Sequence, residues 1–171
     1  MRYFVCCNTY QRFSYLERMA TSLQDRLRQQ KFASPYQEVT LNVLVCADHL
    51  QRRIEEVCGR HGVTSAQYNV LRILRGVHPD GHPRCEIIGR MIQAAPDVTR
   101  LIDRLERAGL VERTRSDADR RLSLSVISKA GLQLLKRMQP EIDALDSEMA
   151  STLTQAEAKT LSTLCEKIYT D

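Results

Sequence analysis

The feature that most constrains the fold is a change of periodicity between residues 98 and 127. Apolar residues first recur at helical spacing, and they then alternate with polar residues in two short runs, LVERTR at 110–115 and LSLSVI at 122–127. Gly109 separates the two patterns, and the residues between the two runs, SDADRR, are almost all polar or charged. The pattern therefore predicts a short helix that ends at Gly109, followed by a β-hairpin with a charged tip.

The predicted helix has two chemically different faces. Its apolar face, which should be buried, carries Val98, Leu101, Ile102 and Leu105. The polar residues that remain point elsewhere, and they are Thr99, Arg100, Asp103 and Arg107. Such a face is free to contact another molecule.

A second short helix is expected immediately before this one. Residues 84–92 and 97–108 both have helical character, and the tight QAAP turn separates them. Two helices of this size and separation indicate a helix-turn-helix, and the hairpin that follows makes it a winged helix-turn-helix. Such a unit places one helix in the major groove of DNA and an arginine-bearing hairpin tip in the adjacent minor groove. A solvated helix face or hairpin tip alone would look similar, but both in this order favour DNA binding.

The rest of the chain is predicted to be helical. At three expected helix starts a Ser or Thr is followed at the third position by Glu or Gln, which is the spacing of a capping box: Ser14 with Glu17, Thr64 with Gln67, and Thr154 with Glu157. The helix from residue 14 should run to the FASP break, another helix should span 37–60, and Ser128 should begin a further one. The segment HPDGHP at 78–83 is predicted to be a loop. Narrow apolar stripes along the long helices need helical partners.

Composition excludes several classes of protein. No stretch approaches the roughly 18 consecutive apolar residues that a membrane span requires. The apolar patch near the start is too short for a signal-peptide core, so we expect a cytoplasmic protein without a membrane partner. The formal net charge of +4 does not by itself indicate nucleic acid. However, every Lys or Arg between residues 61 and 127 is an arginine, the residue best suited to phosphate and guanine. Arginine-rich composition throughout the chain would explain this equally well.

The stretch DVTRLIDRLERAGLVERTRSDADRRLSLSVISKAG resembles the central motif of the MarR family of bacterial transcription regulators. The resemblance is strong over residues 64–135, and the flanking helices match only in layout. It implies a mostly α fold with a small β-hairpin wing, built as a winged helix-turn-helix domain plus a helical dimerisation region. The recognition-helix residues that it implies for DNA binding are Thr99, Arg100 and Arg104. The implied wing residues are Arg115, Asp119, Arg120 and Arg121, of which Arg121 enters the minor groove and Asp119 helps hold the wing.

The resemblance also implies a homodimer that binds a pseudo-palindromic operator in double-stranded DNA, with repression as its mode of action. The expected segments are an N-terminal extension and helix at 1–36, a dimerisation helix at 37–63, the DNA-binding domain at 64–127 and C-terminal dimerisation helices at 128–171. Small aromatic or phenolic inducers of the family occupy a cleft beside the long helix. The residues here that could line such a cleft are Arg53, His61, Tyr68 and Arg72.

Four other functions are alternatives to a ligand-responsive DNA-binding regulator. An enzyme is not expected, because Cys58 and His61 have no third residue in sight to orient them. A metal-responsive regulator would use the crowded His78, Asp80, His82 and Cys85, although we expect neither a metal nor another cofactor. A thiol-redox regulator would use Cys46, Cys58 or Cys85, each of which we expect to be buried and inert. A protein-interaction module that has lost DNA binding is disfavoured by the intact wing motif.

Overall fold

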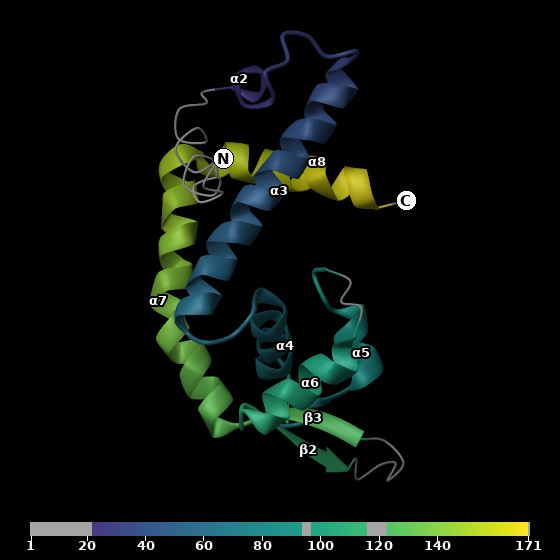
Figure 1. Cartoon of the computed structure of the whole chain (residues 1–171), viewed down its shortest axis with the longest axis vertical. Coiled ribbons are helices and arrows are strands. Elements are labelled where there is room, and N and C mark those ends of the chain that lie inside the picture. Colours follow the sequence, from purple (N-terminus) through teal and green to yellow (C-terminus); the bar gives the residue numbers. More distant parts are fainter. Residues whose placement is uncertain (1–21, 94–96, 116–122, 171) are drawn as a thin grey trace, which may run out of the picture. The chain divides into compact units, whose positions relative to one another are not determined.

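The computed structural model describes residues 22–93, 97–115 and 123–170. The described part is mostly helical with one small antiparallel sheet, as predicted (Figure 1). Its elements are α2 (Leu23–Leu27), α3 (Pro35–Arg60), α4 (Ser65–Arg75), β1 (His82–Pro83), α5 (Arg84–Gly89), α6 (Val98–Arg107), β2 (Val111–Arg115), β3 (Ser123–Ile127), α7 (Lys129–Thr152) and α8 (Gln155–Tyr169). The chain forms two compact units, residues 1–50 and 51–171, and their boundary falls within α3.

Local capping determines where several helices begin. The Thr64 side chain accepts from Gln67 N at 3.2 Å while Gln67 Oε1 accepts from Thr64 N at 2.9 Å, so the capping box of α4 is confirmed. The capping box of α8, formed by Thr154 and Glu157, is confirmed in the same way. Ser128 is the N-cap of α7, as its position in the sequence suggests. These helix starts were predictable because each uses residues only three positions apart.

The first predicted helix is only partly supported. Ser14 and Glu17 lie outside the described residues, and the described helix α2 has its own N-cap at Ser22. It ends at Leu27 because Arg28 adopts a left-handed conformation, with φ of 51°. The helix therefore stops before the FASP segment, where the sequence pattern predicted its end.

The core of residues 51–171 joins the helices to the sheet. Its side chains with no exposed area come from five helices and include Cys58, Val70, Leu71, Leu74, Ile87, Leu105 and Met138. Val111 of β2 and Ile127 of β3 are opposite one another in the sheet, and both are buried. Burying this set of side chains is the main favourable contribution to folding. It also fixes α6 against β2, which places the polar face of α6 outward.

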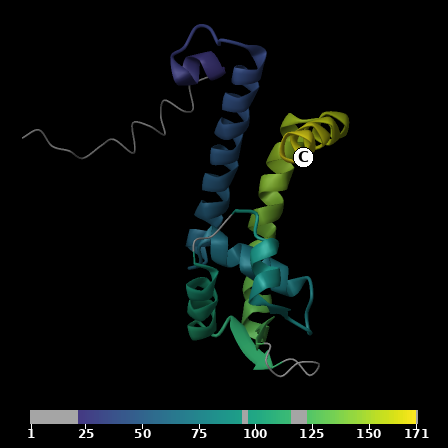
Figure 2. The same ribbon diagram turned by 90° about the vertical axis from the view of Figure 1, so that its right-hand side faces the viewer.

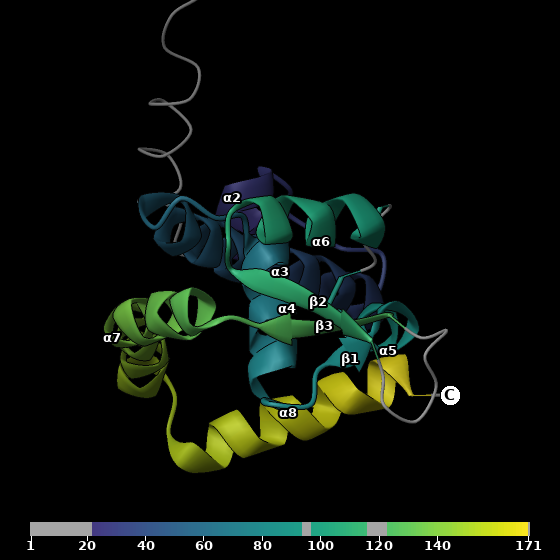
Figure 3. The ribbon, with the colours of Figure 1, turned by 90° about the horizontal axis from the view of Figure 1, so that it is seen from below.

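The sheet has a third strand that the sequence pattern did not predict. The prediction of a loop over 78–83 is wrong for its last two residues, because His82 pairs with Ser125 and Pro83 pairs with Leu124. β3 therefore lies between β1 and β2 (Figure 3). Gly81 permits this pairing, since its φ is +78° and an added Cβ would lie 2.6 Å from the carbonyl oxygen of Ser125.

Ser128 joins the wing to α7. Its side chain donates to Gly109 O at 2.7 Å and accepts from Gly131 N at 3.1 Å, while its own N–H donates to Leu110 O at 3.0 Å. From this junction α7 runs to α8 (Figure 2), and its helix continues through Pro140 to Thr152. No helix among the described residues is both long and apolar enough to span a membrane.

Candidate nucleic-acid interface

Burial of one side of α6 determines which residues face solvent. Val98, Ile102 and Leu105 are at most 4% exposed, as the helical spacing predicted. Thr99, Arg100 and Arg104, the predicted reading residues, are all exposed. The structure therefore brings these three side chains to the outer surface of one helix, where major-groove contacts would be made.

The start of α6 is fixed by Asp97. Its Oδ1 accepts from Arg100 N at 3.0 Å, which is an N-cap interaction. Its other carboxylate oxygen lies 2.9 Å from Nε of Arg100, whose side chain is 78% exposed. Such an exposed pair is weak, so Arg100 can exchange Asp97 for a phosphate or a base.

Arg84 contributes a contact that sequence reasoning missed. This residue begins α5, and its Nη1 donates to Thr99 Oγ1 on α6 at 2.9 Å. It therefore adds a cation beside the predicted reading residues. Nothing in the local spacing indicated it, because the two residues lie on different helices.

Arg113 connects the wing to α6. This residue of β2 forms ion pairs with Asp103 and with Glu106, and its Nε lies 3.3 Å from Glu106 Oε2. A carboxylate on this face would repel phosphate, but the Arg113 guanidinium compensates the charge of Asp103. Sequence reasoning missed Arg113 because its partners lie on a different element.

Only part of the predicted wing can be located. Arg115 is the last residue of β2, pairs with Ser123 of β3 and is exposed. Asp119, Arg120 and Arg121 lie outside the described residues. Their assignment to the wing therefore remains a prediction from the sequence motif.

The four predicted ligand-site residues fall in two places. Arg53 and His61 are near α7, where Arg53 Nη2 lies 2.7 Å from Glu148 and His61 Nε2 lies 2.7 Å from Glu141. Tyr68 and Arg72 lie together on α4, with the Arg72 guanidinium carbon 5.9 Å from the centre of the Tyr68 ring. The structure therefore places two of these residues against α7 and two on α4, and it does not gather all four around one cavity.

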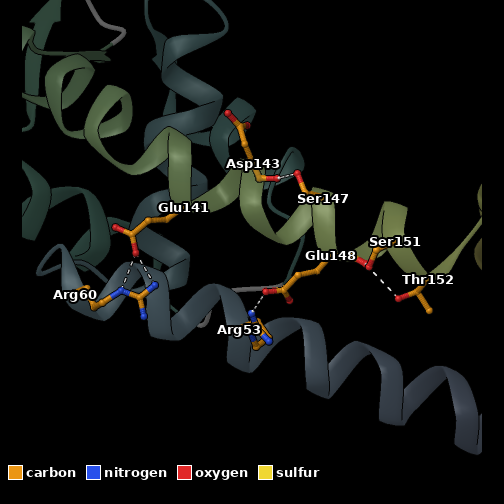
Figure 4. Close-up of polar contacts among 8 residues, drawn as sticks. All are labelled: Arg53, Arg60, Glu141, Asp143, Ser147, Glu148, Ser151 and Thr152. Atoms are coloured by element: carbon orange, nitrogen blue, oxygen red, sulfur yellow. Dashed lines mark hydrogen bonds and ion pairs between the residues drawn. The ribbon is translucent and has the colours of Figure 1, made fainter.

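A cavity of about 220 Å³ lies between α3 and α7. Of the four predicted residues only Arg53 lines it, together with Glu56, Val57, Arg60, Glu141, Ala144, Leu145 and Glu148. Figure 4 shows the two cross-helix ion pairs beside it, Arg53 with Glu148 and Arg60 with Glu141. Hydrogen bonds from His61 and then from Arg60 lower the pKa of the Glu141 carboxyl, so it remains ionised at neutral pH. The cavity lining thus combines apolar side chains with two ion pairs.

The cysteines differ in exposure. Cys58 is buried as predicted, and desolvation, followed by the nearby charge of Glu55, raises the pKa of its thiol to about 11. The prediction that Cys46 and Cys85 are buried is wrong, because both are exposed. Cys46 lies within α3, and Cys85 lies in the first turn of α5.

The loop that suggested metal binding does not assemble a site. Among the described residues no three His, Cys, Asp or Glu side chains are placed to hold a metal ion together. The structure describes all four candidate ligands from this loop, and they do not form such a group: His78, Asp80, His82 and Cys85. The geometry therefore gives no support to a metal-responsive mechanism.

Comparison with known proteins places these residues in a family context. The family model for the MarR family matches residues 63–123, which include α4, α5, α6 and β2. The chain is 27% identical over 121 residues to the HTH-type transcriptional regulator MhqR of Bacillus subtilis, covering 71% of this chain and 79% of that protein. It is 37% identical to a MarR transcription factor from Planctomyces limnophilus, with a TM-score of 0.60 over 80% of this chain and 98% of that one.

A third comparison concerns the fold alone. CouR from Rhodococcus jostii, crystallised bound to p-coumaroyl-CoA, is 18% identical and has a TM-score of 0.70 over 80% of this chain and 95% of that one. The winged helix-turn-helix arrangement is thus shared even where the sequences have diverged.

Proposed function

The chain belongs to the MarR family of transcription regulators, and on that premise we propose that it is a homodimeric, sequence-specific DNA-binding repressor. The observation that carries this proposal is the buried apolar side of α6, which leaves Thr99, Arg100 and Arg104 exposed together. We assign base reading to Thr99 and Arg100 and a backbone contact to Arg104. Arg115, Arg120 and Arg121 serve the minor-groove contact of the wing, and Asp119 holds the wing. Such a regulator acts in the cytoplasm and needs no cofactor.

The dimer is supported by α8. None of its side chains is buried, and its large apolar residues are exposed: Leu161, Leu164, Ile168 and Tyr169. An apolar helix face of this kind favours association with another protein surface. A second copy satisfies it, and the resulting two-fold symmetry matches a pseudo-palindromic operator. Residues 128–171 and the long helix of 37–63 then form the dimerisation region, with the DNA-binding domain at 64–127.

Replacing Arg121 tests the wing assignment. We expect Arg121→Ala to weaken operator binding by about 1 to 3 kcal/mol, because one groove contact is lost, while the thermal unfolding midpoint stays nearly unchanged. Fluorescence anisotropy with a duplex that the wild-type protein selects from a random-sequence pool measures the affinity. Lys159→Ala on α8 is the matched control, since it removes one cation far along the chain from the wing. Equal affinities of the wild type and Arg121→Ala at physiological salt would contradict the assignment.

We further propose that a small aromatic or phenolic ligand releases the repressor. The cavity between α3 and α7 supports this, because Val57, Ala144 and Leu145 offer apolar surface and Arg53 offers a cation at one end. Since the Arg53–Glu148 pair is largely exposed, a ligand carboxylate can replace Glu148 at small cost. A tenfold release of DNA requires the ligand to favour the DNA-incompetent conformation by about 1.4 kcal/mol. His61, through Glu141, and the Tyr68–Arg72 pair remain the other proposed ligand contacts.

The exposed thiols Cys46 and Cys85 support one competing mechanism, a thiol-redox switch. A variant with all six cysteines replaced by serine or alanine separates the two mechanisms. Under the ligand mechanism it should still bind the operator and should still be released by salicylate-like acids, since no sulfur takes part. The measurement is operator binding against increasing acid or peroxide. The thiols are the sensor if wild type responds to peroxide while the cysteine-free variant binds DNA but ignores the inducing signal.

A further inference from the structure

The turn between α5 and α6 is held by the helices that precede it in the chain. Ile92 N donates to Oδ1 of Asn69, on α4, at 3.0 Å. The side-chain amide of Gln93 donates to Oε1 of Gln51, on α3, at 3.2 Å. The turn is therefore hydrogen-bonded to α3 and α4, which lie outside the two helices that it joins.

Gln51 is itself held in place. Its amide nitrogen donates to Glu55 Oε1 at 2.7 Å, one turn further along α3, and to Ser65 Oγ at 2.8 Å, at the start of α4. With Gln93 bound to its carbonyl oxygen, the Gln51 amide uses both its donor and its acceptor groups. A side chain fixed in this way can hold its partner at a defined position.

Side-chain packing contributes little at the same two positions. Ile92 is 78% exposed and Gln93 is exposed as well. The apolar contacts that fix α6 come from residues further along the chain, beginning with Val98. Met91, just before them, packs against the core, and hydrogen bonds then hold the chain at residues 92 and 93 themselves.

We propose that Asn69 and Gln51 are positioning residues for the recognition helix. Residues 92 and 93 come five and four positions before Asp97, the N-cap of α6, so holding them restricts how α6 is oriented. Base reading by Thr99 and Arg100 requires that orientation, whereas attraction to phosphates does not. If α6 samples other orientations, the apparent affinity for the operator falls in proportion to the competent fraction. The inference rests on the proposed DNA-binding function.

The chemistry required at residue 69 is a hydrogen-bond acceptor on a short side chain. Aspartate supplies the same acceptor as asparagine, and alanine supplies none. Comparing Asn69→Ala with Asn69→Asp therefore shows whether an effect comes from losing the hydrogen-bond acceptor or from any replacement of Asn69.

The first experiment compares a duplex that the wild-type protein selects from a random pool with a scrambled duplex of equal length. Asn69→Ala should weaken binding to the selected duplex about three- to tenfold, which corresponds to the loss of one hydrogen bond, and should leave binding to the scrambled duplex unchanged. The dependence of affinity on salt should also stay the same, because the phosphate contacts remain. Asn69→Asp should restore most of the ratio between the two affinities, although its added charge can weaken both.

The second experiment uses the free protein. Amide hydrogen exchange at Ile92 should be faster in Asn69→Ala than in wild type, and Asn69→Asp should restore its protection. In a double-mutant cycle, Gln51→Ala and Gln93→Ala should be non-additive in operator affinity, since each removes the same hydrogen bond.

The outcomes separate this inference from the function on which it rests. A wild-type protein that selects no sequence overturns the proposed function and the inference together. A wild type that selects a sequence, with an Asn69→Ala variant of equal selectivity, overturns the inference alone. Equal losses on both duplexes, in step with a lowered unfolding midpoint and without rescue by aspartate, overturn it too, because they indicate a purely structural role.

Discussion

Leu164→Glu should convert the proposed dimer into a monomer and should weaken operator binding by about 100-fold or more. Leu164 is 51% exposed on α8, between Leu161 and Ile168 on the same side of the helix. In an apolar interface the glutamate carboxylate would be buried without a partner, which is strongly unfavourable. A dimer binds its second half-site at a high effective concentration, and that advantage, typically 10²- to 10⁴-fold, disappears in a monomer.

Sedimentation velocity measures the first effect, and operator titration measures the second. The control is Thr163→Glu, which places the same charge on the other side of α8. The side chain there is exposed and polar in the wild type, so the added carboxylate should stay in water and leave the dimer intact. The folded state of both variants is checked by circular dichroism, since α8 buries no side chain within the described chain and its substitution should leave the fold intact. A folded Leu164→Glu monomer that binds the operator as tightly as wild type would refute the dimer.

The parts of the fold that were predictable depend on residues close together in sequence. The capping boxes of α4 and α8 span only three positions each, and the N-cap roles of Asp97 and Ser128 are equally local. Gly109 ends α6 with a φ of +68°, a conformation that a glycine in that place already indicated. Periodicity likewise predicted the buried face of α6, because a helix repeats every 3.6 residues.

What could not be predicted depends on residues far apart in sequence. β1 exists because His82 pairs with Ser125, and two residues are too few to show an alternating pattern of their own. Arg113 reaches α6, Arg84 reaches Thr99, and Asn69 reaches the turn at Ile92, each across a boundary between elements. The exposure of Cys46 and Cys85 was missed because residue type favoured burial, whereas their position on the helix surface decides it.

The C-terminal half of α3 contacts both the proposed ligand cavity and the turn that precedes α6. Arg53 and Arg60 pair with α7 on one side of this segment, and Gln51 contacts the turn before α6 on another. Because a helix segment moves as a unit, a ligand that breaks the pair between Arg53 and Glu148 can alter the hold on Gln93.

Gly131→Val should destabilise the fold by about 3 kcal/mol or more, the upper end of the usual cost of overpacking. Gly131 is buried near the start of α7, and an added Cβ would contact Leu110 O and lie 2.7 Å from Ile127 Cγ1. Neither neighbour can move easily, because Leu110 O also accepts from Ser128 N and Ile127 is 2% exposed. The junction of wing and α7 would have to open. Urea denaturation, at a fixed protein concentration that keeps the oligomer intact, measures the free energy of unfolding.

Gly59→Ala is the control, because there we expect the free energy of unfolding to change in the opposite direction. An added Cβ at Gly59 meets no atom within 4 Å, and the residue lies in the last turn of α3. Replacing a helical glycine by alanine in open space should stabilise the protein by up to about 1 kcal/mol, since the unfolded chain loses conformational freedom. Gly131→Ala should lower stability despite the same helical preference, with Gly131→Val lowering it further. If Gly131→Ala stabilised the protein as Gly59→Ala does, the close contact between α7 and Leu110 would be absent in solution.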